Sequence, residues 1–115
     1  MAKPIPEFVV YLVDVLQVVG PVYAKPMFGG FGIYLDAVMF GLISDNSFYF
    51  KVDEQSKADF VEAGLQAFKY NRKGRVIEMS YYQAPEEVFD SLEIMREWAN
   101  AAYPCALRSA VKSHK

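Results

Sequence analysis

The ten residues KPMFGGFGIY, at positions 25–34, constrain the fold more than any other part of the chain. Paired glycines permit the positive φ angles of a tight reversal, and segments with strand composition lie on both sides of them. The sequence therefore predicts a β-hairpin of strands 22–28 and 31–35. Pro26 cannot donate to a strand ladder, so we expect it at an edge, at a bulge or among the last paired residues. The turn motif consists of Met27, Phe28, Gly29, Gly30 and Gly32.

One helix is predicted ahead of this hairpin, over residues 6–19. The segment is rich in valine, which favours strands. Its polar residues are nevertheless spaced by three or four, so they share one stripe of a helix; they are Glu7, Tyr11, Asp14 and Gln17. The remaining apolar face is wider than one side of a sheet covers. Either other helices cover the rest of it, or it forms a subunit interface.

The chain after the hairpin is predicted to continue with strands 38–44 and 48–52, a helix over 54–63, strands 67–70 and 76–82, and a helix from Pro85 to Pro104. Asp53 is the expected N-cap of the first of these helices. A break at Asp90-Ser91 is expected to divide the last segment into a short turn and a longer helix. Ala37 is a poor residue for a turn with positive φ, so the turn at residues 36–37 is of another type or is strained.

Segregated strands and helices with tight hairpins indicate an α+β fold class. We expect two layers, an antiparallel β-sheet with helices packed mainly on one face, in the order α-β4-α-β2-α. Residues 1–104 are predicted to form a single domain. Residues 105–115 are predicted to form a basic, flexible tail.

Charge and cysteine content exclude several classes of protein. The net charge is −2, which argues against an autonomous DNA-binding domain, because such domains carry a basic surface. The single cysteine, Cys105, cannot make an internal disulfide, so the cytoplasm is the expected compartment. No stretch reads as a signal peptide or is apolar enough to span a bilayer.

No catalytic, cofactor or metal site is predicted. The glycines at 29, 30 and 32 precede a strand, whereas a phosphate-binding loop needs a helix N-terminus after it. His114 and Cys105 supply at most two soft ligands, fewer than a structural zinc site needs. The carboxylates of the last helix, at Glu86, Glu87, Glu93 and Glu97, have the pattern of solvated helix faces.

Two other features of the sequence suggest contact with a partner. A basic cluster on the second hairpin comprises Lys69, Arg72, Lys73 and Arg75, and Lys25 lies beside the glycine turn. These cations could meet phosphates or an acidic protein surface. They could equally keep a hairpin tip soluble and unpaired, which the negative net charge favours.

The sheet itself is predicted to be apolar on both faces. One side is expected to hold Phe40, Leu42, Phe48, Phe50 and Val52, and the other is partly populated by Met39, Ile43, Tyr49, Ile33 and Leu35. A second side that no helix covers would be an exposed patch of the kind that marks a partner site. The residues alone therefore favour an interaction module.

Three motifs give the chain a resemblance to the N-terminal domain family of the TfoX/Sxy competence regulators. They are Lys25 to Gly30, the strand Phe48 to Asp53, and Met79-Ser80-Tyr81-Tyr82 before Pro85-Glu86-Glu87. The chain departs from the family pattern at Lys25, where arginine is usual, and at Ala37, where glycine is usual. The resemblance implies a fold similar to secretion chaperones and YjbR-like proteins. It also implies regulation of DNA-uptake genes together with the cyclic-AMP receptor protein, without direct DNA binding.

The resulting hypothesis is a non-enzymatic regulatory domain that binds protein partners, including a second copy of itself as a homodimer. The alternative is a nucleic-acid-binding module that uses the hairpin from Lys69 to Arg75 and exposed aromatic residues. A third hypothesis, a small-molecule binder or enzyme, requires a pocket with convergent polar groups.

Overall fold

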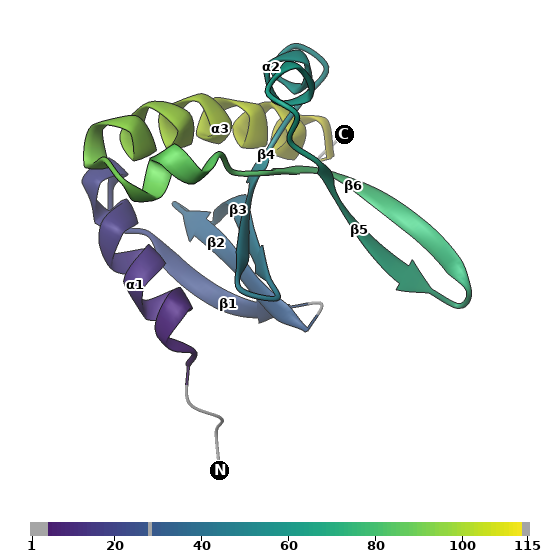
Figure 1. The fold of residues 1–115 in the computed structure, drawn as a ribbon, viewed down its shortest axis with the longest axis horizontal. Helices are drawn as coiled ribbons and strands as arrows, with labels where there is room; N and C mark the ends of the chain where they lie inside the picture. Colours follow the sequence, from purple (N-terminus) through teal and green to yellow (C-terminus); the bar gives the residue numbers. More distant parts are fainter. Residues whose placement is uncertain (1–4, 28, 114–115) are drawn as a thin grey trace.

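The structure, a computed structural model, describes residues 5–27 and 29–113 (Figure 1). Phe28 and His114, both considered above, lie outside the described residues. The elements are α1 (Glu7–Leu16), η1 (Gln17–Val19), β1 (Tyr23–Met27), β2 (Gly30–Leu35), β3 (Val38–Ser44), β4 (Ser47–Lys51), α2 (Lys57–Glu62), β5 (Ala67–Arg72), β6 (Arg75–Gln83), η2 (Glu86–Phe89) and α3 (Leu92–Ser113). No helix in the described part is long and apolar enough to cross a membrane.

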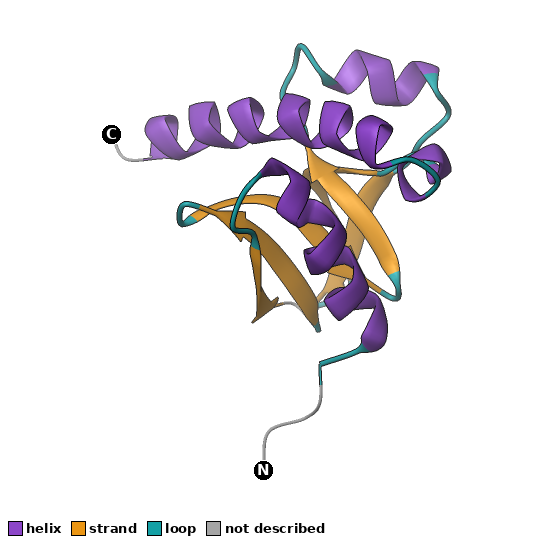
Figure 2. Ribbon diagram, turned by 90° about the vertical axis from the view of Figure 1, so that its left-hand side faces the viewer, coloured by secondary structure: helices purple, strands orange, loops and turns teal. Residues whose placement is uncertain are grey.

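The six strands form one antiparallel sheet in the order β1-β2-β3-β4-β6-β5. Helices α1 and α3 lie against one face of it, so the predicted α+β class is confirmed (Figures 1 and 2). Pro26 lies in β1, an edge strand, where a residue without an N–H is tolerated, as expected. The β5–β6 hairpin projects away from the other four strands (Figure 1).

Two-residue turns close three of the hairpins, and both central residues of each turn have positive φ. This is the type I′ geometry, whose twist matches that of the flanking strands. The turns are Asp36-Ala37, Asp45-Asn46 and Lys73-Gly74. Ala37 has φ of 64°, a region that costs a residue with a Cβ atom roughly 1–2 kcal/mol. Of the two expectations for this turn, backbone strain is therefore the correct one.

A β-bulge in β3 decides which side chains reach which face. Ile33 pairs with Gly41, but the next residue, Tyr34, pairs with Met39, so Phe40 is an extra residue. The bulge shifts the alternation by one, because side chains change face at every residue of a regular strand. Leu42 therefore lies on the face opposite Phe40. The prediction that these two residues share a face is wrong.

The main core lies between the sheet and the helices. Its buried members come from α1, the sheet and α3, and the largest are Phe40, Phe50, Leu12, Leu16, Ile33 and Met95. Ile33, Leu35 and Ile43 belong to this core rather than to the opposite face, which corrects a second part of the two-sided prediction. Phe48 and Phe50 meet edge to face with ring centroids 4.7 Å apart.

The wide apolar face of α1 is covered only in part. Val9, Leu12 and Leu16 are buried in the core. Val10 and Tyr11 remain exposed, at 56% and 45% of their surface. The first helix thus packs on the molecule with one stripe and leaves apolar surface outside.

The segment before α2 is a turn rather than the predicted first turn of the helix. The Oδ1 atom of Asp53 accepts hydrogen bonds from the N–H groups of Gln55 and Ser56, at 3.1 and 2.9 Å. Asp53 therefore caps this turn, as its residue type suggested, and the helix begins at Lys57.

The last helix does not end at Pro104, and residues 105–113 continue it. α3 continues through Pro104 to Ser113. Inside a helix, proline removes one backbone hydrogen bond and clashes with the preceding turn. Together these effects destabilise the helix by about 3 kcal/mol. Cys105 and Ala106 are nevertheless buried against the body of the molecule, and Arg108 forms an ion pair with Asp53. These contacts outweigh the local preference of proline.

Candidate interaction surface

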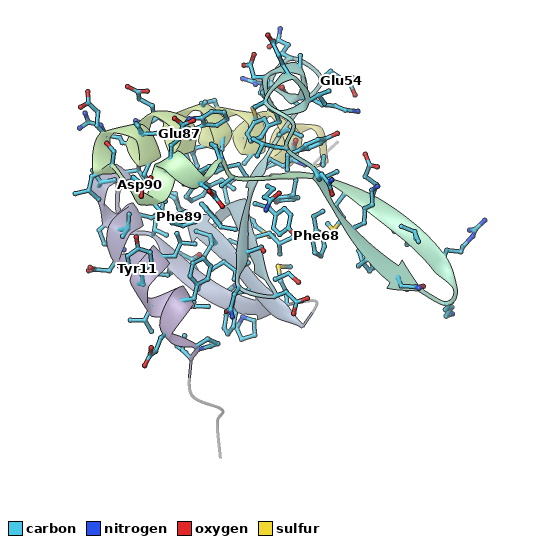
Figure 3. The ribbon with its side chains drawn as sticks, viewed as in Figure 1. Tyr11, Glu54, Phe68, Glu87, Phe89 and Asp90 are labelled. Atoms are coloured by element: carbon cyan, nitrogen blue, oxygen red, sulfur yellow. The ribbon has the colours of Figure 1, made fainter. Side chains whose placement is uncertain are left out.

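A second hydrophobic cluster lies on the face of the sheet opposite α1 and α3, and we call it the helix-free face. Leu42, Phe68 and Tyr81 are buried in it, and the half-buried side chains around them are Met27, Met39, Tyr49, Tyr70 and Met79. They come from five of the six strands. Figure 3 shows Phe68 inside the angle between the β5–β6 hairpin and the rest of the sheet. No helix of the described residues covers this cluster (Figure 1).

A glycine makes room for the sulfur atoms of this face. A Cβ atom on Gly32 would lie 2.6 Å from Sδ of Met27 and 3.0 Å from Sδ of Met39. Two methionines therefore close over a strand that carries no side chain at this point. Methionine is flexible and polarisable, so it adapts to differently shaped partners. The glycine that was assigned to a turn motif thus shapes the candidate surface.

Aromatic rings fix the other half of the helix-free face. Phe68 meets Tyr49 edge to face at 5.2 Å and stacks on Tyr70 at 6.1 Å. The hydroxyl of Tyr81 donates to the carbonyl oxygen of Met39 at 3.4 Å. Burial, and then the nearby Tyr34, raise the pKa of Tyr81 to about 12. Tyr81 is therefore neutral at physiological pH.

Two lysines lie against tyrosine rings on this side of the sheet. Nζ of Lys25 lies 5.2 Å from the centre of the Tyr34 ring, and Nζ of Lys51 lies 5.2 Å from that of Tyr81. Lys51 also donates to Oγ of Ser80 at 2.6 Å, and burial lowers its pKa. Cation–π contacts of this kind hold the ammonium groups in defined positions. The helix-free face is therefore apolar at its centre and positively charged beside two of its rings.

The residues predicted around the glycine turn divide into two groups. Lys25, Met27 and Gly32 share one face, because they lie at alternate positions of β1 or opposite one another across β1 and β2. Gly30 has a structural role, since a Cβ atom there would lie 2.0 Å from the carbonyl oxygen of Ile43. Gly30 therefore allows the backbones of β2 and β3 to approach closely.

The basic hairpin forms a site of its own, away from Lys25. All four of its predicted cations are exposed. Lys69 pairs across the strands with Glu78, whereas Arg72 pairs with Arg75. Like charges directly opposite one another destabilise a hairpin. The one ion pair among the described residues, Arg108–Asp53, involves none of these cations.

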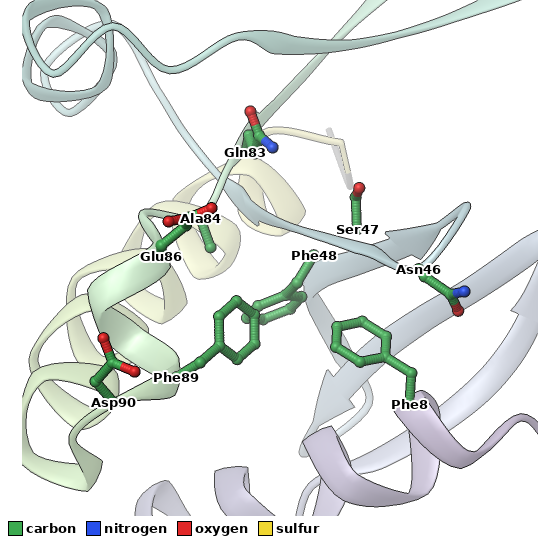
Figure 4. Close-up of a pocket in the computed structure, with 9 residues that line it drawn as sticks. All are labelled: Phe8, Asn46, Ser47, Phe48, Gln83, Ala84, Glu86, Phe89 and Asp90. Atoms are coloured by element: carbon green, nitrogen blue, oxygen red, sulfur yellow. The ribbon is translucent and has the colours of Figure 1, made fainter.

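A pocket that sequence reasoning missed lies between α1, the β3–β4 turn and η2 (Figure 4). Its volume is about 410 Å³, and it is lined by Phe8, Asn46, Ser47, Phe48, Gln83, Ala84, Glu86, Phe89 and Asp90. The rings of Phe8 and Phe89 lie 6.0 Å apart. Glu86 and Asp90 are exposed, as a solvated helix face requires, but they also border this cavity. The lining residues are far apart in sequence, so no local pattern could have indicated the pocket.

The described residues contain no group of three or more histidine, cysteine, aspartate or glutamate side chains placed to hold a metal ion. Cys105 is buried in α3, where its Sγ lies 3.4 Å from Oγ of Ser56 and 3.3 Å from a guanidinium nitrogen of Arg108. The thiol thus belongs to the packing between α3 and the turn before α2.

Comparison with known proteins gives one family. Residues 14–106 match the model of the TfoX N-terminal domain. The DNA transformation protein TfoX1 of Aliivibrio fischeri is 31% identical over 62 residues, which are 54% of this chain and 30% of that protein. Protein Sxy of Escherichia coli is 25% identical over 84 residues, which are 72% of this chain and 40% of that protein. The match therefore spans less than half the length of either relative.

Proposed function

Because the chain belongs to the TfoX N-terminal domain family, we propose that it is a regulatory domain that acts by binding a protein partner and performs no chemistry of its own. The helix-free face is the observation that supports this proposal most directly. Apolar side chains from five strands gather there without a helix over them, and contiguous apolar surface of this kind marks interaction sites.

The chemistry of the face suits protein recognition. Tyrosine and methionine are enriched at protein interfaces, and a few buried aromatic anchors carry most of the binding energy there. Tyr49 and Tyr70 are half-buried and already packed on the ring of Phe68, so they lose little freedom when a partner binds. Lys25 and Lys51 favour an acidic rim on that partner.

We infer that the partner is a transcription regulator, and the cyclic-AMP receptor protein is the first to test. This inference rests on the competence role of the family. The chain would then influence DNA-uptake genes through that regulator, without contacting DNA itself. A net charge of −2 is consistent with such an indirect role.

The experiment measures binding of this chain to purified cyclic-AMP receptor protein by calorimetry. A variant with Lys25→Glu and Met27→Asp changes the helix-free face at an edge strand and should weaken binding by about tenfold or more. The matched control is Lys57→Glu with Val61→Asp, which makes the same changes of charge and polarity on α2. It should leave the affinity unchanged.

Circular dichroism must show that both variants remain folded. Equal affinity of the two folded variants would contradict the role of the helix-free face. Absence of binding by the unmodified chain would contradict the choice of partner.

A further inference from the structure

The tip of the β5–β6 hairpin carries positive charge that its own chain does not neutralise. Arg72 and Arg75 face each other across the strands, and Lys73 occupies the turn between them. All three are exposed, and none takes part in the ion pair found among the described residues. Direct juxtaposition of like charges is unfavourable within one molecule. A local cost of this kind is expected where a binding function requires it.

The pocket beside η2 has the opposite character. Its floor contains the rings of Phe8, Phe48 and Phe89, and Glu86 and Asp90 stand at its border (Figure 4). Glu87, the neighbour of Glu86 on η2, adds a third exposed carboxylate. A guanidinium group stacks on aromatic faces and donates hydrogen bonds to carboxylates, so this combination suits an arginine side chain.

The size of the pocket fits more than one side chain. A volume of about 410 Å³ lies at the lower end of the range for small-molecule sites, about 300–1,000 Å³. The pocket is therefore large enough for a turn that presents two neighbouring cations. Val76, which follows the tip and is 69% exposed, offers apolar surface for the phenylalanine rings.

The tip cannot reach the pocket of its own chain. Gln83 lines the pocket and Arg75 belongs to the tip, and they are the two ends of the nine-residue strand β6. An extended strand of this length holds its ends about 26 Å apart. Figure 3 likewise shows Phe89 and Asp90 on the left of the molecule, whereas the hairpin extends to the right.

We propose that the hairpin tip of one copy docks into the acidic aromatic pocket of a second copy. Arg72 or Arg75 lies against the rings of Phe8 and Phe89 and pairs with Glu86 or Asp90. The two contacting surfaces differ, so the association is head to tail, and it closes into a ring or continues as a chain of copies. It leaves the helix-free face of every copy available for the regulatory partner.

Sedimentation velocity on the full chain tests this proposal, at rising protein concentration and at two salt concentrations. We expect association near 50 mM salt that weakens strongly near about 500 mM, because exposed charges are then screened. Arg72→Glu with Arg75→Glu should reduce association by about tenfold or more, and Glu86→Lys with Asp90→Lys should do the same. Arg72→Lys with Arg75→Lys keeps the charge and should retain much of the association.

A charge swap gives the decisive comparison. An equimolar mixture of the two charge-reversed variants restores association, because the acidic tip of one fits the basic pocket of the other and the unmodified basic tip fits the unmodified acidic pocket. A chain that carries all four reversals should associate with itself. Glu62→Lys with Asp59→Lys, on the exposed side of α2, is the matched control and should change nothing.

Three outcomes would overturn the proposal. The first is a strict monomer at low salt. The second is a mixture of the two folded variants that does not associate. The third is association that the α2 control variant weakens as much as the charge-reversed variants do. Binding of a labelled oligonucleotide that depends on Arg72 and Arg75, by a chain that stays monomeric, would assign the tip to nucleic acid instead.

Discussion

The two faces of the sheet use neighbouring residues of the same strands for different purposes. On β4, Phe50 is fully buried under the helices, whereas Tyr49 is half-buried on the helix-free face. The covered face is filled mainly with phenylalanine, isoleucine and leucine, and the helix-free face with methionine and tyrosine. Rigid shapes suit permanent packing, and adaptable or amphipathic shapes suit a surface that must also meet water and a partner.

The charged residues of the two faces also differ in the partners that they contact. A carboxylate and a guanidinium are paired near the helices, where Asp53 accepts from Nε of Arg108 at 3.0 Å. The cations of the helix-free face instead rest on tyrosine rings. An ion pair neutralises its charges, whereas a lysine on a ring keeps its charge available. The comparison suggests that one face supplies stability and the other supplies binding.

The largest expected effect tests that division on one strand. Phe50→Ala should lower the free energy of unfolding by about 3–5 kcal/mol, because it leaves a cavity in the main core. Tyr49→Ala should cost about 1 kcal/mol, since the ring is only partly buried. Urea unfolding of both variants measures the difference. Equal losses would show that the helix-free face is as much a core as the covered one.

Two glycines of β2 sharpen the comparison at an intermediate scale. Gly30→Ala places a methyl group against the backbone oxygen of Ile43, which cannot move freely, so we expect a loss of about 1–3 kcal/mol. Gly32→Ala meets only side-chain atoms, those of Met27, Tyr34 and Met39, and should cost less. It should nevertheless weaken partner binding, because it displaces both methionines. Thermal unfolding and the calorimetric assay separate the two effects.

The opposite ranking would contradict this account. If Gly32→Ala unfolded the protein more readily than Gly30→Ala, the methionines would have to be fixed parts of the structure rather than an adaptable surface.

The smallest expected effect concerns the carboxylate of Asp53, which pairs with Arg108. Hydrogen bonds from the backbone of Ser56 and from Arg108 hold the pKa of Asp53 well below its usual range. A depressed carboxyl pKa stabilises the folded state above the unfolded-state value, about 3.9, and the contribution is lost as the pH falls through the folded-state pKa.

Asp53→Asn keeps the capping hydrogen bonds and removes the charge. We expect the variant to be slightly less stable than the unmodified chain at pH 7, with a gap that closes as the pH falls below about 4. Denaturant unfolding at several pH values measures it. A gap that stays constant with pH would mean that the charge of Asp53, held by Ser56 and Arg108, contributes nothing to stability.

Much of the fold could be predicted because local and tertiary preferences agree. β3 occupies residues 38–44 as predicted, and the turn at Asp36-Ala37 lies where expected. Proline at position 104 was misleading because local preference there opposes tertiary packing. Burial of Cys105 and Ala106 against the rest of the molecule outweighs the broken hydrogen bond.

The candidate sites were predictable to different degrees. Lys25, Met27 and the hairpin cations were identified because charge and turn patterns are local. The facing of Leu42 was not, since it depends on an extra residue in β3 that no sequence pattern marks. The acidic pocket was also missed, because Phe8 and Phe89 come from opposite ends of the chain and meet only in the folded protein.

The bulge at Phe40 has a practical consequence for protein engineering. A single strand supplies Phe40 to the main core and, two positions later, Leu42 to the other face. Anyone who transplants the methionine and tyrosine surface onto a different sheet must carry this irregularity with it. A regular strand with the same residues would turn Leu42 inward and leave the grafted surface without its centre.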